Sequence, residues 1–262
     1  MQELSEYRFS TIVSSDEGYV YAGTFGQGIL RMSLNGSWQV CSEGLPADVT
    51  IYRLQRMGTE IYAATEKGLF MLHNNKWQSA GLEIPCYHIV DSCNTFAMTR
   101  CGLMYSDEGE WMPFAYPNRS CYDFLMTPQF LFIALSSGIA YYDMLTGSWD
   151  EFAFQHAVTS IAVFRKSLIG VLADGSMVIG NKKGGFITVA FEGMFIYKLA
   201  TYKGNVFACS NNGLFKIVML QDRLILQSLG IHCAVTDLVF AETHMLIATL
   251  NQGILKNLLE VE

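Results

Sequence analysis

Tyr62-Ala-Ala-Thr-Glu-Lys-Gly-Leu-Phe-Met-Leu72 is the stretch that decides the fold of this 262-residue chain. It reads as an apolar strand, a short turn that ends on glycine, and a second apolar strand. The chain repeats this pattern seven times, with the turn glycine at positions 28, 68, 102, 138, 175, 213 and 253. Successive glycines are 34 to 40 residues apart, and self-similarity at such a period indicates a repeat architecture.

Two further sequence patterns recur beside these copies. A strand-like phrase precedes each copy, as in Val158-Thr-Ser-Ile161, and a tryptophan follows four of the copies, at Trp38, Trp77, Trp111 and Trp149. Each unit therefore contains four short strands, which we name strand A to strand D in chain order. Short, evenly spaced strands with a recurring aromatic residue are typical of β-propeller blades.

The expected fold is all-β: a seven-bladed β-propeller of four-stranded antiparallel blades, forming a single domain over residues 1–262. One sheet of about 37 residues cannot bury both of its faces alone, so neighbouring blades must stack. Strand B is almost entirely apolar, as in sheets that are covered on both faces. The expected blade starts are Phe9, Val49, Cys86, Cys121, Val158, Ile196 and Val235.

Closure of the ring needs a strand D for blade 7, because strand C of that blade lies at Gly253–Leu258, near the end of the chain. We expect Met1–Ser5 to supply it, since this segment falls one blade period before strand D of blade 1. The alternative is that Leu258–Val261 turn back and complete the blade. Deletion of residues 1–7 separates the two, because an unchanged melting temperature would contradict the first.

Composition narrows the class of partner. Charged residues make up 16% of the chain, the net charge is −7, and the 17 basic residues are not clustered. Nucleic acid and an anionic membrane surface are therefore not expected as partners. No apolar run reaches about 18 residues, the length of a membrane span, and the N-terminus lacks the pattern of a signal peptide. We expect a cytoplasmic protein that is a monomer or a subunit of a complex; the alternative is a domain cut from a secreted parent.

Neither a metal nor a cofactor is expected. The seven cysteines form no C-x-x-C pair, and the five histidines show no metal-ligand spacing. Cys86, Cys121 and Cys209 occupy apolar positions of the repeat, which favours small core hydrophobes over a disulfide or a metal site. Gly23-Thr-Phe-Gly-Gln-Gly28 is similar to a phosphate-binding loop, but such a loop opens a helix and Ile29–Leu34 reads as a strand.

The repeat resembles the two-component-regulator type of propeller repeat. Its strand A, strand B and B–C turn are matched by Val158-Thr-Ser-Ile161, Ala63-Ala-Thr65 and Asn211-Asn-Gly-Leu214, and its strand D tryptophan by Trp149. In that family the propellers are mostly extracytoplasmic sensor or ligand-binding parts of larger receptors, so the resemblance implies a ligand-binding propeller. Tyr105-Ser-Asp-Glu-Gly-Glu-Trp111 is also similar to the aspartate box of sialidase-like propellers, one residue short, which implies a structural hairpin.

A candidate site follows from propeller geometry, in which strand A lines the central channel and shares one face with the B–C turns. Aligned on the phrases above, the third residues of strand A are Thr11, Ile51, His88, Asp123, Ser160, Lys198 and Asp237. The B–C turns add Phe25, Glu66, Lys67, Arg100, Asp174 and Asn211. From these and the second strand A residues, the predicted ligand-binding set is Tyr87, His88, Tyr122, Asp123, Tyr197, Lys198, Asp237, Arg100 and Glu66.

Mixed charge and three tyrosines suit a polar small ligand or a peptide. We predict a non-catalytic binding module that recognises such a partner, a small molecule, peptide or protein, at the central-channel face. One alternative is an enzyme of the lyase, isomerase or cyclase type, with His88 or Asp123 as base and a tyrosine as acid. A second is a structural subunit that docks through its blade edges. A polar channel mouth that binds only water fits the same residues.

Overall fold

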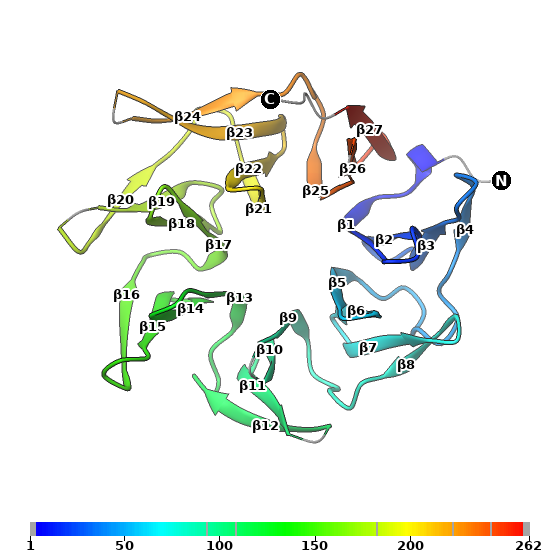
Figure 1. Ribbon diagram of the computed structural model, residues 1–262, viewed down its shortest axis with the longest axis horizontal. Coiled ribbons are helices and arrows are strands. Elements are labelled where there is room, and N and C mark those ends of the chain that lie inside the picture. Colours follow the sequence, from blue (N-terminus) through cyan, green and yellow to red (C-terminus); the bar gives the residue numbers. More distant parts are fainter. Residues whose placement is uncertain are drawn as a thin grey trace. The chain divides into compact units, whose positions relative to one another are not determined.

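The computed structural model describes residues 4–92, 94–107, 109–181, 183–221, 223–241 and 243–258. It is a seven-bladed β-propeller made of small antiparallel sheets (Figure 1), which confirms the predicted fold class. Helix is limited, in these ranges, to one 3-10 turn, η1 Leu4–Glu6. None of the described helical segments has the length and apolar character needed to cross a membrane.

The first compact unit comprises residues 1–118 and 236–262. It holds three four-stranded sheets and the strands of the last blade, and each complete sheet follows chain order from strand A to strand D. The strands are β1 Phe9–Ser14, β2 Val20–Thr24, β3 Ile29–Met32 and β4 Trp38–Val40; β5 Ile51–Met57, β6 Glu60–Thr65, β7 Gly68–His73 and β8 Lys76–Ser79; β9 Cys86–Asp91, β10 Thr95–Thr99, β11 Gly102–Asp107 and β12 Glu110–Ala115; β25 Val235–Phe240, β26 His244–Thr249 and β27 Ile254–Leu258.

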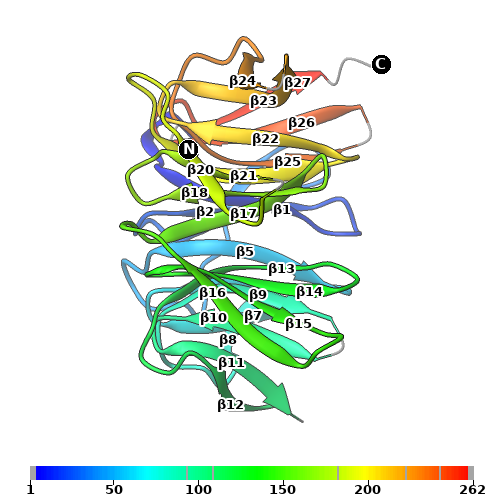
Figure 2. The same ribbon diagram turned by 90° about the vertical axis from the view of Figure 1, so that its left-hand side faces the viewer.

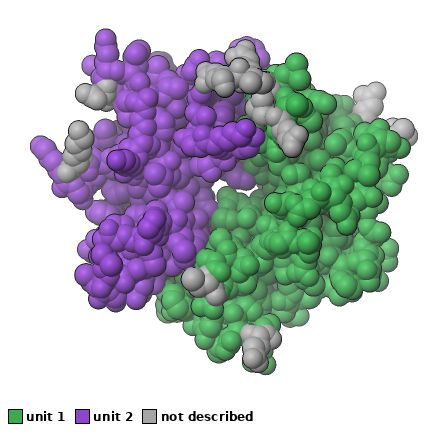
Figure 3. Space-filling model, viewed as in Figure 1, with its two compact units in different colours: residues 1–118, 236–262 green, residues 119–235 purple. Residues whose placement is uncertain are grey.

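The second compact unit comprises residues 119–235 and holds three four-stranded sheets. Figure 2 shows its strands from the side, with β21 and β22 running along each other. The residues of the two units are coloured separately in Figure 3. The strands are β13 Cys121–Met126, β14 Phe130–Leu135, β15 Gly138–Asp143 and β16 Ser148–Ala153; β17 Val158–Phe164, β18 Ser167–Leu172, β19 Met177–Gly180 and β20 Phe186–Val189; β21 Ile196–Tyr202, β22 Asn205–Ser210, β23 Gly213–Leu220 and β24 Arg223–Ser228.

The last blade has three strands in the described part of the chain, β25, β26 and β27. The two segments expected to supply its fourth strand fall partly outside the described residues, at 1–3 and 259–261. Leu4 itself lies in the 3-10 turn and packs on the apolar cluster that joins Phe9 of β1 to Leu246 of β26. The identity of the closing strand stays a prediction.

Strand A begins, in every blade, with an apolar residue that is fully buried. These residues are Phe9, Ile51, Cys86, Cys121, Val158, Ile196 and Val235, each 0% exposed. Burial raises the pKa of the Cys86 and Cys121 thiols to about 12, so both stay neutral at physiological pH. The prediction that these cysteines act as core hydrophobes is confirmed.

In blade 2, the predicted start of strand A is two residues too early. Its strand A begins at Ile51, not at Val49, because Ile51 pairs with Thr65 in the place that Phe9 and Cys86 take in their sheets. Val49-Thr50 copies the Val-Thr phrase of other blades, yet Val49 packs into the core from the connector that precedes the strand. The third residue of this strand is therefore Arg53, and Ile51 is a core residue.

The B–C turn explains why threonine and glycine recur in the repeat. The hydroxyl at the end of strand B donates to the carbonyl of the turn glycine over 2.7–3.0 Å and accepts an N–H from within the turn. One side chain thus satisfies two backbone groups of a tight turn. The hydroxyl residues are Thr24, Thr65, Thr99, Ser210 and Thr249.

Gly138 tests how strictly the turn requires glycine. It has φ +148°, and a Cβ at this position would lie 1.9 Å from the carbonyl oxygen of Phe152. Gly138→Ala is therefore expected to lower the free energy of unfolding by about 2 kcal/mol or more, measured by urea denaturation. Gly193→Ala is the control, since Gly193 has φ +67° but no atom within 4 Å of its Cβ position. Equal losses in both variants would contradict the steric explanation.

Two of the strand D tryptophans, Trp77 and Trp111, connect neighbouring blades. The Trp77 indole Nε1–H donates to the carbonyl of Cys41 over 2.8 Å, and the Trp111 indole donates to Ala80 over 2.7 Å. Trp149 differs, because it is 37% exposed and its ring contacts Tyr142, with the centroids 5.0 Å apart. The structural role expected of these residues is confirmed for Trp77 and Trp111.

Candidate functional site

A β-bulge at the second residue of strand A recurs in six sheets of the described structure. The first and third residues of the strand pair with consecutive residues of strand B, so the second residue is the extra one. Bulges of this kind re-aim a side chain and are frequent beside functional sites. The bulged residues are Ser10, Tyr52, Tyr87, Tyr122, Thr159 and Tyr197.

These residues fall into two chemical classes. Where the residue is small, its hydroxyl donates to the backbone: Ser10 to the Ile51 carbonyl over 2.5 Å, and Thr159 to the Val171 carbonyl over 3.4 Å. The other four are half-buried tyrosines, which we name the bulge tyrosines: Tyr52, Tyr87, Tyr122 and Tyr197. The bulge therefore forms with a small hydroxyl residue, and its geometry does not require an aromatic ring.

Two bulge tyrosines meet in the first unit. The rings of Tyr52 and Tyr87 have their centroids 5.1 Å apart and are tilted by 40°. Arg53 follows the first ring in sequence, and His88, which is 8% exposed, follows the second. The sequence prediction included Tyr87 and His88 but missed Tyr52 and Arg53, because blade 2 was aligned two residues too early.

The B–C turns reach the same end of these strands. The Glu66 N–H donates to the Thr50 carbonyl over 3.2 Å, and the Thr50 N–H donates to Glu66 Oε1 over 3.3 Å, just before β5. The Arg100 N–H donates to the Pro85 carbonyl over 2.9 Å, just before β9. The first unit thus brings Glu66 and Arg100 to the strand ends that carry the tyrosine pair, as the sequence predicted for the turns.

In the second unit, Tyr197 is accompanied by an aromatic residue that the sequence prediction did not include. Phe195 precedes β21, is 38% exposed, and has its ring centroid 5.3 Å from that of Tyr197. Asn211, in the adjoining B–C turn, accepts from the Phe195 N–H at its Oδ1 over 2.7 Å and donates its own N–H to the Phe195 carbonyl over 3.0 Å. Lys198, which follows Tyr197, is half-buried. An aromatic residue directly before strand A was the signal available in the sequence.

A polar cluster lies at the corresponding end of β17. The Ala173 N–H donates to the Ala157 carbonyl over 2.8 Å, which places the turn beside the strand start. His156 Nε2 is 3.5 Å from Asp174 Oδ2. Ser176 donates to Asp174 Oδ1 from its hydroxyl over 2.6 Å and from its N–H over 2.9 Å, and these bonds lower the pKa of the Asp174 carboxyl. Asp174 therefore remains negatively charged at neutral pH.

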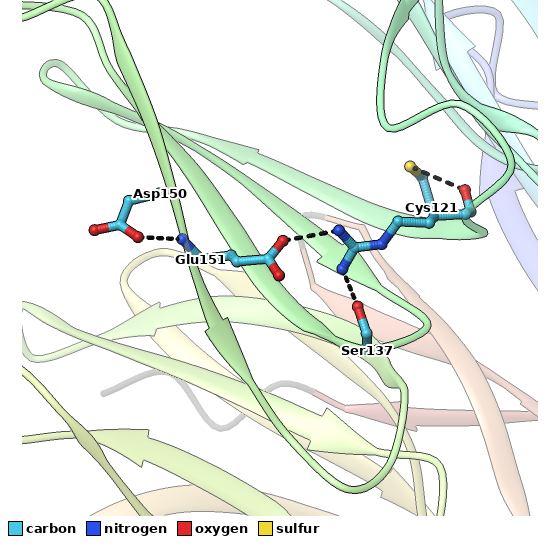
Figure 4. A network of polar contacts seen from close by, with 5 residues as sticks. Cys121, Ser137, Asp150 and Glu151 are labelled. Atoms are coloured by element: carbon cyan, nitrogen blue, oxygen red, sulfur yellow. Dashed lines mark hydrogen bonds and ion pairs between the residues drawn. The ribbon is translucent and has the colours of Figure 1, made fainter.

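Arg119, which lies shortly before Tyr122 in the chain, forms a network of polar contacts (Figure 4). Arg119 Nη1 is 2.8 Å from Glu151 Oε2 on β16, and Nη2 donates to the Ser137 hydroxyl in the B–C turn. The Arg119 carbonyl accepts the thiol of Cys121 over 3.8 Å. These contacts connect the segment before β13 to the turn and to strand D of the same blade, and they position the bulge that follows.

Two of the predicted ligand-binding residues, Asp123 and Asp237, are buried acceptors, 5% and 3% exposed. Asp237 Oδ2 accepts the Thr11 hydroxyl over 2.8 Å and the Ile12 N–H over 3.2 Å, while Oδ1 accepts the Leu238 N–H over 2.9 Å. The Thr11 hydroxyl in turn accepts the Leu54 N–H over 3.0 Å. One carboxylate thus connects three consecutive blades through β25, β1 and β5.

Asp123 repeats this arrangement in the second unit. Its Oδ2 accepts the Ser160 hydroxyl over 3.2 Å and the Ile161 N–H over 3.0 Å, its Oδ1 accepts the Phe124 N–H over 3.0 Å, and the Ser160 hydroxyl accepts the Leu199 N–H over 3.1 Å. We name the two arrangements the carboxylate links. Both oxygens of each acid are used inside the fold. Among the described residues, no group of three or more His, Cys, Asp or Glu side chains is placed to hold a metal ion.

No protein-family model matches the chain, and neither does any curated protein. Solved structures do. The extracellular domain of the putative hybrid two-component system BT4673 from B. thetaiotaomicron is 16% identical, with a TM-score of 0.77 over 95% of this chain. This chain spans only 38% of the length of that domain. The location of the present chain stays a prediction, since this neighbour is extracellular and the sequence favoured the cytoplasm.

Two other similar structures match along most of their own length. Virginiamycin B lyase from Staphylococcus aureus is 13% identical, with a TM-score of 0.74, 97% of this chain and 96% of the lyase being covered. YCF48, solved bound to a D1 peptide, is 11% identical, with a TM-score of 0.70, and the match covers 97% of this chain and 94% of YCF48. At these identities the likeness shows the propeller fold alone. The similar structures include an extracellular domain of a two-component-system protein, and the repeat of this chain resembles the two-component-regulator type.

Proposed function

We propose that the chain is a peptide-binding module whose recognition surface is built on the bulge tyrosines. The observation that carries the proposal is the contrast within one backbone position. Ser10 and Thr159 occupy the bulge and bond to backbone carbonyls, whereas four blades place a tyrosine there. The bulge itself needs only a small hydroxyl residue at this point, so the recurring aromatic rings are not explained by the bulge geometry.

Tyrosine suits the recognition of a peptide. Its ring offers a large contact area with few rotatable bonds, its hydroxyl forms hydrogen bonds, and tyrosine is enriched among the residues that dominate binding energy. The tyrosines stand on strands, which position side chains more firmly than loops do. The B–C turns add Glu66 and Arg100 beside them in the first unit. YCF48, solved bound to a D1 peptide, supports the proposal, since a protein of similar fold and length accepts a peptide.

Binding fits the site better than catalysis. Asp123, one candidate base, accepts a hydroxyl and two N–H groups within the fold, and these bonds hold its carboxylate in place. His88 is 8% exposed, which restricts the approach of a substrate. The similarity to virginiamycin B lyase suggests how the alternative, an enzymatic activity, can be measured. Quinupristin, which has been observed with an inactive variant of that lyase, is expected to remain intact on incubation with this protein, as followed by mass spectrometry.

The test is selection of a peptide from a random phage-displayed library on the immobilised protein. Replacing both tyrosines of the first unit, Tyr52→Ser and Tyr87→Ser, is expected to weaken the selected peptide about 100-fold, since two central aromatic contacts are lost. Serine is the natural occupant of the same bulge in blade 1, so the fold is retained. Tyr105→Ser, at a half-buried position on β11, is the control. Equal affinity of the double variant and the wild type, by fluorescence anisotropy, would contradict the proposal.

A further inference from the structure

We infer that the second unit binds a basic residue of a peptide, with its stem on the rings of Phe195 and Tyr197 and its charge against Asp174; the inference rests on the proposed function. Tyr197 is the bulge tyrosine of β21, and its ring centroid lies 5.3 Å from that of Phe195. The B–C turn that carries Asp174 connects this ring pair to the carboxylate, through contacts that can be followed residue by residue.

Phe195 is held between two B–C turns. Its N–H donates to Asn211 Oδ1 over 2.7 Å, and its carbonyl accepts the Asn211 N–H over 3.0 Å. On the other side, the N–H of Ile196 donates to the Gly175 carbonyl over 3.2 Å, and a Cβ on Gly175 would lie 2.7 Å from the Phe195 ring. The ring therefore packs on Gly175, yet Phe195 stays 38% exposed. A large apolar side chain that is fixed in place and exposed is available to a ligand.

The carboxylate of Asp174 belongs to the same turn as Gly175. Its Oδ1 accepts the Ser176 hydroxyl over 2.6 Å and the Ser176 N–H over 2.9 Å. The Phe195 ring and the carboxylate thus contact adjacent residues, Gly175 and Ser176. One lysine or arginine side chain can reach across two such contacts, because it joins an apolar stem to a charged end.

The second carboxylate oxygen, Oδ2, is the one that a ligand can pair with. Its partner in the described structure is His156 Nε2 at 3.5 Å, and the side chains of His156 and Asp174 are 49% and 42% exposed. The bond from the Ser176 hydroxyl lowers the pKa of the carboxyl, so Asp174 is ionised at neutral pH. A histidine is largely neutral above about pH 7 and then leaves that charge uncompensated. The turn explains the bonds of Oδ1, whereas Oδ2 remains accessible.

Basic side chains match this combination of groups. The arginine guanidinium stacks on aromatic rings and pairs with carboxylates through two N–H donors, and a lysine ammonium is likewise attracted to a ring face. The whole chain carries a net charge of −7, so long-range attraction also favours a basic peptide over an acidic one. Lys198, the nearest cation in sequence to the two rings, is half-buried and interacts within the fold.

The experiment compares two phage-displayed libraries of equal length, one enriched in Lys and Arg and the other in Asp and Glu. Both are selected on the wild-type protein at pH 8. The best peptide is then measured by fluorescence anisotropy against the wild type, Asp174→Asn and Phe195→Leu. Asparagine retains an oxygen that can accept both Ser176 bonds and removes the charge, so the turn is kept.

Asp150→Asn is the matched control. Asp150 is an exposed acid of the same unit on β16, and its Oδ1 also accepts a backbone N–H, that of Glu151, over 2.8 Å. The substitution therefore changes the net charge by the same amount as Asp174→Asn, but on strand D.

The expected result is selection from the basic library. Asp174→Asn should then bind about tenfold more weakly or worse, since a charge-assisted contact is lost. Phe195→Leu should weaken binding about threefold or more, because leucine still covers Gly175 but lacks the ring face. Asp150→Asn should change affinity by less than about twofold.

A second measurement locates the contact from the side of the peptide. Each arginine of the selected peptide is replaced in turn by citrulline and each lysine by norleucine, which removes the charge and keeps the stem. One replacement should weaken binding to the wild type about tenfold and have little effect on binding to Asp174→Asn, whose partner charge is already absent. The weakening on the wild type does not depend on the folding of a variant.

Several outcomes would overturn the inference. Selection from the acidic library, or equally from both, would leave the proposed function standing and refute the basic preference. A basic peptide that binds Asp174→Asn as it binds the wild type, or that is weakened as much by Asp150→Asn, would refute the role of Asp174. Failure to select any peptide from these libraries and from the unbiased one would refute the proposed function, and the present inference with it.

Discussion

Replacing Trp77 with alanine is expected to lower the free energy of unfolding by about 3–5 kcal/mol. The side chain is 1% exposed and lies in a core cluster with Tyr21 and Ile51, which belong to two neighbouring blades. Its indole N–H also donates to the carbonyl of Cys41. The substitution therefore opens a large cavity and leaves a backbone carbonyl without its donor.

Urea denaturation followed by far-ultraviolet circular dichroism measures the loss. Trp149→Ala is the control, because Trp149 occupies the corresponding place in its blade but is 37% exposed. Its loss should be clearly smaller. A loss at Trp77 no larger than at Trp149 would show that the connection between blades 1 and 2 contributes little. Trp77→Phe should fall between the wild type and alanine, since it retains part of the buried area and loses the hydrogen bond.

Asp237→Ala is expected to cost about 3 kcal/mol or more, because it leaves a buried hydroxyl and two buried N–H groups without an acceptor. These donors belong to Thr11, Ile12 and Leu238. Thr11→Val removes the hydroxyl that donates to Asp237 and accepts the Leu54 N–H. Part of its loss in stability should therefore be the same loss that Asp237→Ala causes. In a double-mutant cycle, the two substitutions should therefore be non-additive by about 1 kcal/mol or more.

Asp16→Ala is the control for this prediction. Asp16 is an exposed acid whose partner, Arg56, is also at the surface, so the expected loss is at most about 1 kcal/mol. Additive effects of Asp237→Ala and Thr11→Val would show that the carboxylate link does not act as one unit. The same cycle with Asp123 and Ser160 repeats the test in the second unit.

The fold could be predicted because its determinants are local. The turn at Thr65–Gly68 depends on one hydroxyl, one glycine and their backbone neighbours, all within four residues. Such turns recur along the sequence, and the strands between them are buried and apolar. Period and fold class therefore followed from the sequence. The one error of register, in blade 2, arose because Val49-Thr50 imitates a strand start while it lies in a connector.

The site could be predicted only in part, because it depends on contacts between blades. Asp123 and Asp237 were included as variable polar residues, but no local pattern shows that each accepts hydrogen bonds from the next blade. The bulge is likewise invisible in one strand, since it is defined by pairing with another. Tyr52 was missed because its place in the bulge depends on the register of blade 2. Phe195 was missed because its role depends on a ring contact with Tyr197.

Within strand A, the carboxylate links stabilise the fold, and we propose that the bulge tyrosines bind the ligand. The first and third residues are largely buried and fix the strand to its neighbours, while the second residue is released from the ladder. A rigid strand with one re-aimed side chain is a suitable support for recognition. This arrangement also explains why substitutions at Asp237 should act on stability, whereas those at Tyr52 and Tyr87 should act on affinity.

The most direct test of this account is site-specific photo-cross-linking. Tyr87→p-benzoylphenylalanine places a photoreactive ring at the bulge of β9, and the same substitution at Tyr105 places it on β11 of the same sheet. Each protein is irradiated with the peptide selected from the random library, and the products are analysed by mass spectrometry. The account predicts a covalent adduct from position 87 and little from position 105. An adduct from position 105 with none from position 87 would contradict it.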